Sequence, residues 1–238
     1  MPVVEGAAPL RTNGGSVMTS AQAPLISSDQ DAFEAVVRDS CHVRRFQDEA
    51  VPREDIEHMV GVATSAVSAC NAQVWRFIAI QDRKLISAMQ AAVLERFEQL
   101  ALRPGLALQE QKRMVARAQA LLFAKAPLCI AVLATPHDSP MEELMRLSGI
   151  TQEEHDRLCA RPELQSAGAA VQLLTSTAHA MGYGACWTCA PIVAGERLEQ
   201  LLDVEPPTRL VALLPIGRPA ELPVAHKRLP LQQVLSFR

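Results

Sequence analysis

The spacing of apolar residues predicts a buried central helix in the second half of the chain. Within residues 163–181, apolar side chains recur every three or four positions, and further apolar residues lie on the other sides. A helix that is apolar nearly all round is buried in the protein interior. Gly182 and Gly184 follow and are expected to end this helix, because glycine adopts the backbone conformations that close helices.

The other segments alternate between strand and helix patterns. Residues 127–134 (PLCIAVLA) form a continuous apolar run, which is typical of a strand covered on both faces. Shorter strands are predicted at 74–80, 185–188 and 209–216. Helices are predicted at 29–39 (capped by Ser28, with Phe33, Val36 and Val37 inward), 52–67 (with Val67 on its apolar face), 84–125 (two, broken at Pro104-Gly105), 141–160 and 194–202. Short strands between helices predict an α+β fold, a β-sheet flanked by helices.

Composition limits the class of protein. The chain has 238 residues, a net charge of −3 and 49% hydrophobic residues, which is ordinary for a globular domain and favours neither nucleic acid nor an anionic membrane as partner. No apolar run approaches the roughly 20 residues that cross a bilayer. Six cysteines are too few for a disulfide scaffold and indicate reduced thiols in a cytoplasmic protein. Residues 1–28 are interpreted as a flexible extension, and residues 29–238 as one domain.

Two segments carry candidate chemistry. Arg44 and Arg45 form a small cationic cluster just after the first predicted helix. Ser68, Asn71 and Gln73 lie in a turn that leads directly into a strand and offers hydroxyl and amide groups. A cationic loop and a turn rich in donors and acceptors suit a ligand with a phosphate tail and a polar ring system.

Four segments in order resemble the FMN-dependent nitroreductase family. They are Ser40-Cys-His-Val-Arg-Arg-Phe46, Ala66-Val-Ser-Ala-Cys-Asn-Ala-Gln-Val-Trp75, Gly182-Tyr-Gly-Ala-Cys-Trp-Thr-Cys-Ala-Pro191, and Leu214-Pro-Ile-Gly217 followed by His226-Lys-Arg-Leu-Pro-Leu231. The resemblance implies a nitroreductase-like mixed β-sheet flanked by helices. It also implies an intertwined homodimer with FMN in each of two interface clefts.

The resemblance assigns expected roles to residues of the phosphate loop and the C-terminal segment. Arg44 and Arg228 match positions that hold the FMN phosphate and ribityl chain, and His226 lies where a second cation often sits. Ser40 and His42 belong to the phosphate loop. Arginine suits this role because its planar guanidinium makes paired hydrogen bonds to phosphate.

The resemblance also assigns residues to the flavin ring. Asn71 and Gln73 are expected to act as donors and acceptors to its pyrimidine edge, and Ser68 lies on the turn beneath that edge. The backbone at Cys189 and Ala190 is expected to offer an amide to N5 or O4. An amide donor there stabilises negative charge on the reduced ring. The implied activity is oxidoreduction in two hydride transfers, from NAD(P)H to FMN and from FMN to an electron-poor small molecule such as a nitroaromatic or quinone. No catalytic side chain is assigned.

The chain departs from the family pattern at several positions. Ser40-Cys-His42 stands where the family has Arg-Arg-Ser, and Ala190 stands where it has glycine. Arg38 could replace the missing cation through a bulge. The arginines could also be solvated surface charges, and the polar residues of the turn could serve only to close it. The protein could then bind flavin without turnover, or catalyse flavin fragmentation, dehalogenation or dehydrogenation on the same scaffold.

Cys186 and Cys189 are spaced as in C-x-x-C motifs, which bind metals or act as redox dithiols. Neither use is favoured, because Cys186 lies in an apolar, strand-like stretch and the sequence shows no second pair of ligands at zinc-binding spacing. Tyr183 is the only tyrosine, which argues against a tyrosine-bearing substrate lid such as that of the related iodotyrosine deiodinases.

Overall fold

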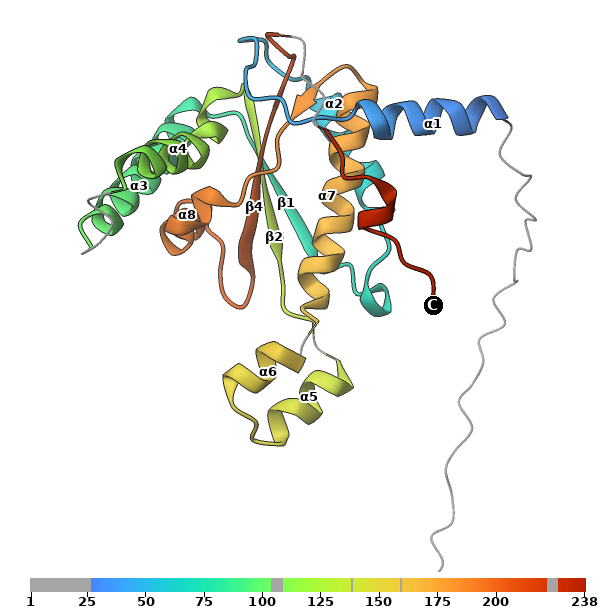
Figure 1. The fold of residues 1–238 in the computed structure, drawn as a ribbon. Helices are drawn as coiled ribbons and strands as arrows, with labels where there is room; N and C mark the ends of the chain where they lie inside the picture. The colour runs from blue at the N-terminus through green and yellow to red at the C-terminus, as the bar shows by residue number, and fades with distance from the viewer. Residues whose placement is uncertain (1–26, 104–108, 138, 159, 222–226) are drawn as a thin grey trace, which may run out of the picture.

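The computed structural model describes residues 27–103, 109–137, 139–158, 160–221 and 227–238. Its centre is a four-stranded sheet in the order β1-β2-β4-β3 (Figure 1). The strands are β1 (Trp75–Ile80), β2 (Leu128–Ala134), β3 (Gly184–Ala185) and β4 (Arg209–Gly217). All three ladders are antiparallel, and an isolated bridge between His42 and Ala185 adds a parallel pairing at the β3 edge. The predicted α+β architecture is confirmed.

The helices cover both faces of the sheet. Their bounds are α1 (Ser27–Asp39), α2 (Arg53–Ala63), α3 (Arg83–Ala101), α4 (Glu110–Ala120), α5 (Pro140–Leu147), α6 (Gln152–Leu158), α7 (Pro162–Ala180) and α8 (Gly195–Leu201). Four short 3-10 helices lie between them: η1 (Ala69–Asn71), η2 (Leu122–Lys125), η3 (Ala190–Ala194) and η4 (Leu231–Gln233). Helices α2 and α7 pack on one face, and α3 and α8 on the other (Figure 1).

Strand β2 lies at the centre of the core because every residue in it is apolar. All seven of its residues are buried, as the continuous apolar run predicted. Alternate side chains enter two clusters: Ile130 and Val132 pack towards α7, whereas Cys129 and Ala131 pack towards α3. Burial of Cys129 raises the pKa of its thiol to about 12. The central helix is likewise confirmed, since Ala167, Val171, Leu174 and Ala178 of α7 are buried.

Several predicted boundaries are wrong. The single helix expected at 141–160 is two helices, because Gly149 adopts a left-handed φ of 69° and breaks the segment. The strand expected at 185–188 is only β3 plus a bridge from Thr188 to Leu213. Ser28 lies within α1 and is not its cap. The break predicted at Pro104-Gly105 lies outside the described residues, as does most of the predicted extension.

Four residues expected to face the core are instead exposed or only half-buried. Phe33 and Val37 of α1 are 65% and 43% exposed, and Val36 is half-buried, because α1 projects from the body and touches mainly α7 (Figure 1). Val67 is 84% exposed because α2 ends at Ala63. Helices α5 and α6 also project from the body (Figure 1). None of the described helices is long and apolar enough to span a membrane.

Candidate functional site

The cationic segment after α1 is fixed against the β3 edge of the sheet. The Val43 amide donates to the Ala185 carbonyl at 2.9 Å, and the Gln47 amide donates to the Arg218 carbonyl at 2.8 Å. Val43 is buried against Gly184, where an added Cβ would lie only 2.4 Å from a Val43 methyl carbon. These contacts hold the backbone on both sides of Arg44 and leave its side chain exposed.

His42 is oriented by the stretch that follows β3. The Trp187 backbone amide donates to Nδ1 of His42 at 3.3 Å. This bond requires Nδ1 to accept, so the neutral ring carries its proton on Nε2. The contact joins residues 145 positions apart and brings the first and third motifs together.

These two segments line a cavity of about 670 Å³, which we call the cationic cavity. Its wall includes His42, Arg44, Arg45, Val115, Ala118, Gln119, Leu122, Lys125, Cys186, Trp187, Thr188, Cys189, Ala190 and Glu221. Arg45 forms an ion pair with Glu221 at 3.5 Å. Arg44 and Lys125, which also line this wall, form no ion pair with a carboxylate in the part of the chain that the structure describes. The volume lies within the range of cofactor pockets, and the charge suits an anion.

The amides at the rim of this cavity are free to bind a ligand. Cys189 precedes η3, and Ala190 is the first residue of η3. Among the described residues, the backbone amides of Cys189 and Ala190 donate to no group. The first amides of a helix have no partner within it. Two exposed donors therefore lie next to the cations, where the sequence predicted a contact to the flavin ring.

A second cavity of about 490 Å³ adjoins the first, and we call it the α1–α7 cavity. Ser40, His42 and Arg228 line it together with residues of α1 and α7, and Trp187 lies in the walls of both cavities. Arg44 and Arg228 therefore lie in adjacent cavities that share His42 and Trp187. The Ser40 hydroxyl donates to the Val36 carbonyl at 2.7 Å, so its proton already has an acceptor.

The proposed substitute for the missing family arginine does not reach either cavity. Arg38 pairs with Glu34 on its own helix at 2.6 Å, and its side chain is 77% exposed. The suggestion that a bulge lets Arg38 replace the missing cation is wrong in this structure, because α1 continues to Asp39 without a bulge. His226 lies outside the described residues.

The two cysteines of the C-x-x-C spacing differ in environment. Cys186 is 5% exposed, and burial raises the pKa of its thiol, an effect that the Arg44 guanidinium partly offsets. Cys189 is exposed. No group of three His, Cys, Asp or Glu side chains within the described part of the chain could hold a metal ion.

The turn before β1 has a strained backbone. Cys70, Asn71 and Gln73 have φ values of 51°, 53° and 46°, although none of them is glycine. Such values cost free energy and persist where the surrounding structure enforces them. The Gln73 amide donates to the Ser68 hydroxyl at 3.1 Å, and the Gln73 side chain donates to Asn71 at 3.4 Å. The side chains of Asn71 and Gln73 are thus held together at the surface.

This turn lies outside both cavities within one chain. The Ala69 amide donates to the Ser166 hydroxyl near the start of α7 at 3.2 Å, whereas the α7 residues that line the α1–α7 cavity run from Gln172 to His179. Six residues of helix separate Ser166 from Gln172, about 9 Å along the axis. None of Ser68, Asn71 and Gln73 lines the cationic cavity or the α1–α7 cavity. The chain therefore brings the cationic segment and the amides of Cys189 and Ala190 together, and the Ser68–Gln73 turn lies apart from them.

Sequence reasoning missed Trp187, Gln119 and Lys125 as lining residues. Trp187 stood within the third motif, which was the available signal, whereas nothing in the helical pattern of α4 distinguished Gln119.

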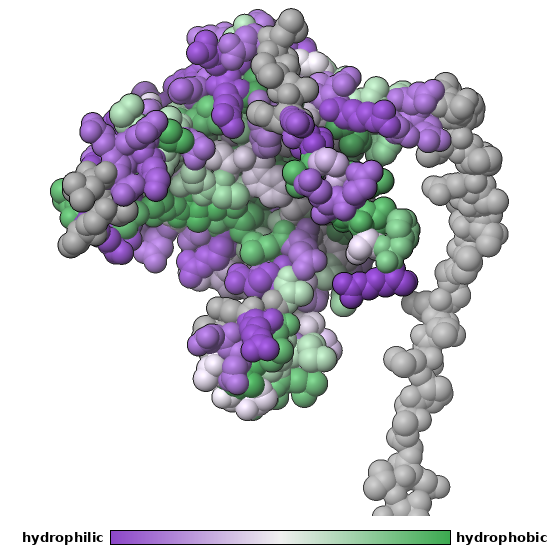
Figure 2. Space-filling view, in the orientation of Figure 1, coloured by the Kyte–Doolittle hydropathy of each residue, from purple (hydrophilic) through white to green (hydrophobic). Residues whose placement is uncertain are grey.

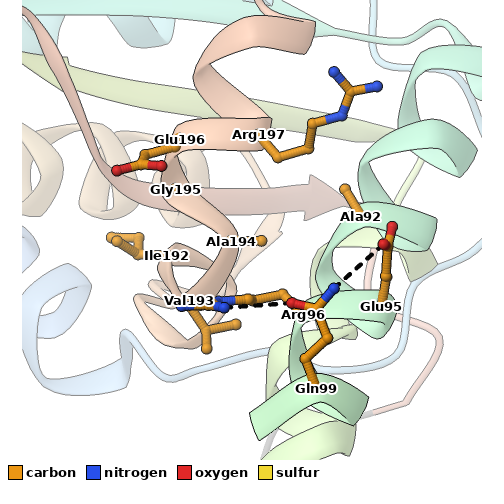
Figure 3. A pocket seen from close by; sticks show the side chains of 10 residues that line it. All are labelled: Ala92, Glu95, Arg96, Gln99, Ile192, Val193, Ala194, Gly195, Glu196 and Arg197. Carbon is orange, nitrogen blue, oxygen red and sulfur yellow. Dashed lines mark hydrogen bonds between the residues drawn. The ribbon is translucent and has the colours of Figure 1, made fainter.

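Another cavity, of about 600 Å³, lies between α3 and the η3–α8 segment (Figure 3). Glu95, Arg96 and Gln99 form hydrogen bonds to one another along its α3 wall. None of the predicted site residues lines it.

The sequence profile of the nitroreductase family matches residues 35–218. The chain belongs to the nitroreductase family. As a family member it is a flavoprotein of the oxidoreductase class. Among curated relatives of this nitroreductase-family chain, 5,6-dimethylbenzimidazole synthase of Rhodospirillum rubrum is 27% identical over 196 residues, which cover 82% of this chain and 85% of the relative.

Solved structures show the same nitroreductase fold. A BluB-like flavoprotein from Clostridium difficile 630 superposes with a TM-score of 0.78 at 24% identity, covering 86% of this chain and 98% of the other. Oxidised iodotyrosine deiodinase bound to FMN and 3-iodo-L-tyrosine superposes with a TM-score of 0.63 at 22% identity, covering 87% and 97%. The nitroreductase-family chain thus shares its fold with a flavoprotein and with a deiodinase that was solved with FMN bound.

Proposed function

We propose that the protein is an FMN-dependent oxidoreductase that uses NAD(P)H to reduce an electron-poor acceptor such as a nitroaromatic or a quinone. The observation that carries the proposal is the cationic cavity, in which Arg44 and His42 lie beside the free amides of Cys189 and Ala190. The donor set fits FMN: the permanent charge of Arg44 and the Nε2 donor of His42 for its phosphate, and backbone amides for the acceptors of its ring.

Each part of the chain has a role in this proposal. Arg44 and Arg228 bind the phosphate, and His42 donates from Nε2 while the Trp187 amide holds its Nδ1. The amides of Cys189 and Ala190 orient the ring and stabilise negative charge on its reduced form. When bound, FMN supplies the hydride chemistry, and the protein supplies binding, orientation and electrostatics.

A second copy of the chain would complete the site. The Ser68–Gln73 turn is strained, its Asn71 and Gln73 are exposed, and none of Ser68, Asn71 and Gln73 lines either cavity. Apolar side chains are exposed on α1 and along the C-terminal segment, where Leu229 and Phe237 are 67% and 88% exposed. A twofold dimer pairs one surface with itself, so it would cover these side chains and bring the turn of one chain to the cavities of the other. We therefore propose an intertwined homodimer, and sedimentation as a 26 kDa monomer at micromolar concentration would contradict it.

The test of cofactor binding is reconstitution with FMN. The purified protein is expected to turn yellow and to quench FMN fluorescence on titration. Arg44→Gln should weaken the affinity for FMN about tenfold or more, because it removes a charge-assisted hydrogen bond to phosphate. Arg53→Gln is the matched control: it removes the same charge from an exposed α2 ion pair that is worth little. A protein that stays colourless in excess FMN refutes the proposal.

The reaction itself is tested by turnover. NADH or NADPH should be consumed only when a benzoquinone or a nitrobenzene derivative is present. The observation that favours a second candidate is the altered phosphate loop, where Ser40 bonds to its own helix and no arginine stands in for it. Bound FMN without consumption of NAD(P)H would favour a flavin-binding role. Product analysis with oxygen would distinguish flavin fragmentation from simple reoxidation.

The proposed compartment is the cytoplasm. The five described cysteines, at positions 41, 70, 129, 186 and 189, are all free thiols. Free thiols are typical of proteins kept in a reducing environment. Of these, Cys70 and Cys189 are exposed and would be vulnerable to oxidation elsewhere.

A further inference from the structure

An apolar cavity lies between the α3–α4 hairpin and η3, and we call it the hairpin cavity. Its volume is about 500 Å³, enough for a small organic molecule. The apolar wall consists of Phe97, Leu100, Ala101, Ala116, Ala120 and Val193. Figure 2 shows apolar surface gathered along this side of the hairpin. The wall therefore favours a flat hydrocarbon or aromatic group over a polar one.

The charges around the hairpin cavity have one sign. Lys112 and Arg113 of α4 line it, and no Asp or Glu among the described residues does. Arg113 has no ion pair with a described residue, and its Nε atom is buried without a hydrogen-bond partner. The permanent positive charge of the Arg113 guanidinium favours an anionic group on a ligand in this cavity. Arg117, one turn further along α4, is different because it pairs with Glu98 at 3.9 Å.

The hairpin cavity is continuous with the proposed cofactor site. Gln119 and Ala190 line both the hairpin cavity and the cationic cavity. Ala190 is also a residue whose amide is proposed to contact the flavin ring. An occupant of the hairpin cavity would thus touch the same residue that is proposed to contact the ring.

We propose that the hairpin cavity selects the electron acceptor, and that this acceptor is a flat apolar molecule bearing an anionic group. The apolar wall binds the ring system, and Arg113 binds a carboxylate or sulfonate on it through its guanidinium fork, with Lys112 adding positive charge. This assignment rests on the proposed function for its link to the flavin. The binding of the anion does not, because it depends only on α3, α4 and η3.

The test compares two probes of equal shape that differ in charge. The probes are 2-naphthoate and 2-naphthamide, titrated into the full-length protein by calorimetry, both with and without FMN. Naphthoate should bind at least tenfold more tightly than naphthamide. Arg113→Gln should weaken naphthoate binding about tenfold or more and change naphthamide binding less than twofold. Arg117→Gln removes the same charge from the same helix and should leave both probes unchanged.

The outcomes separate the two proposals. Equal binding of the two probes, or equal losses in Arg113→Gln and Arg117→Gln, overturns the assignment of the hairpin cavity. If the protein binds naphthoate selectively through Arg113, the anion site is supported. If the same protein takes up no FMN, the proposed oxidoreductase function is refuted while the anion site stands. Circular dichroism spectra and melting temperatures of both variants that match the wild type establish that the affinities compare folded proteins.

Discussion

Replacing Gly184 by alanine tests whether the β3 edge positions the phosphate-binding segment. A Cβ at this position would lie 2.4, 2.6 and 2.7 Å from three carbons of Val43. Ordinary carbon contacts begin at about 3.4 Å, so Val43 would have to move by about 1 Å. Val43 is 4% exposed and its amide is bonded to Ala185, so the segment cannot move without breaking packing or this bond.

The expected effects follow from that displacement. Overpacking a buried position costs about 1 to 3 kcal/mol, which corresponds to a fall in melting temperature of about 2 to 12 °C for a domain of this size. A shift of about 1 Å also moves His42 and Arg44 relative to Ala190, and misplacements of this size weaken oriented interactions by a large factor. We expect Gly184→Ala to weaken FMN binding at least tenfold.

The measurements are thermal unfolding by circular dichroism and FMN titration by fluorescence. Gly61→Ala is the matched control: Gly61 lies in α2, and a Cβ there would meet nothing within 4 Å. Alanine is better than glycine in a helix by about 0.8 to 1 kcal/mol, so this variant should melt slightly higher and bind FMN normally. Equal melting temperature and FMN affinity in Gly184→Ala and wild type would show that the segment is not positioned by this contact.

Two further predictions concern buried and exposed side chains. The Tyr183 hydroxyl donates to Asp55 at 2.5 Å, and burial raises the pKa of Tyr183 to about 12, above its ordinary value of 10. The folded protein thus favours the protonated phenol, so the stabilising effect of Tyr183 should be complete below pH 10 and lost between pH 10 and 12. Urea unfolding should show that the free energy of unfolding of the wild type falls with pH over this range. The Tyr183→Phe variant should lack this fall. Iodoacetamide should modify the exposed Cys189 but not the fully buried Cys129 in the folded protein, and FMN should protect Cys189, as mass spectrometry of peptides would reveal.

The parts of the fold that sequence predicted well are those in which local pattern and burial agree. Strand β2 is apolar at every position and buried at every position. The apolar spacing along 163–181 likewise matches the buried side of α7. In both segments the pattern is continuous over the whole element, so its period and its length are visible without knowledge of the partners.

The misplaced boundaries depend on contacts between distant parts of the chain. The stretch after Ala185 keeps contact with β4, because the amides of Cys186 and Thr188 donate to the carbonyls of Pro215 and Leu213. The Trp187 amide between them faces away from β4 and donates to the His42 ring, a residue 145 positions away. Spacing within a segment carries no information about such a bond.

The candidate site also combines features that local sequence predicts with contacts that it does not predict. Residue types in the four motifs indicated a phosphate-binding segment and a polar turn, and the structure brings Arg44, His42, Cys189 and Ala190 to one cavity. It leaves the polar turn beside the start of α7. Motif order along the chain predicts which residues have a role, but it does not predict which of them meet within one chain.

The exposed side chains of α1 and the separation of the turn have a common physical explanation. An apolar pattern predicts that Phe33 and Val37 are buried, yet among the described residues no element covers them. These residues line the α1–α7 cavity together with Arg228, so the uncovered apolar surface and the candidate phosphate site are the same place. A second chain docked over this cavity would bury the apolar residues and exclude water from the cations at once. The sequence pattern is then correct for the dimer and wrong only for the isolated chain, since hydrophobic spacing records burial without recording which chain provides it.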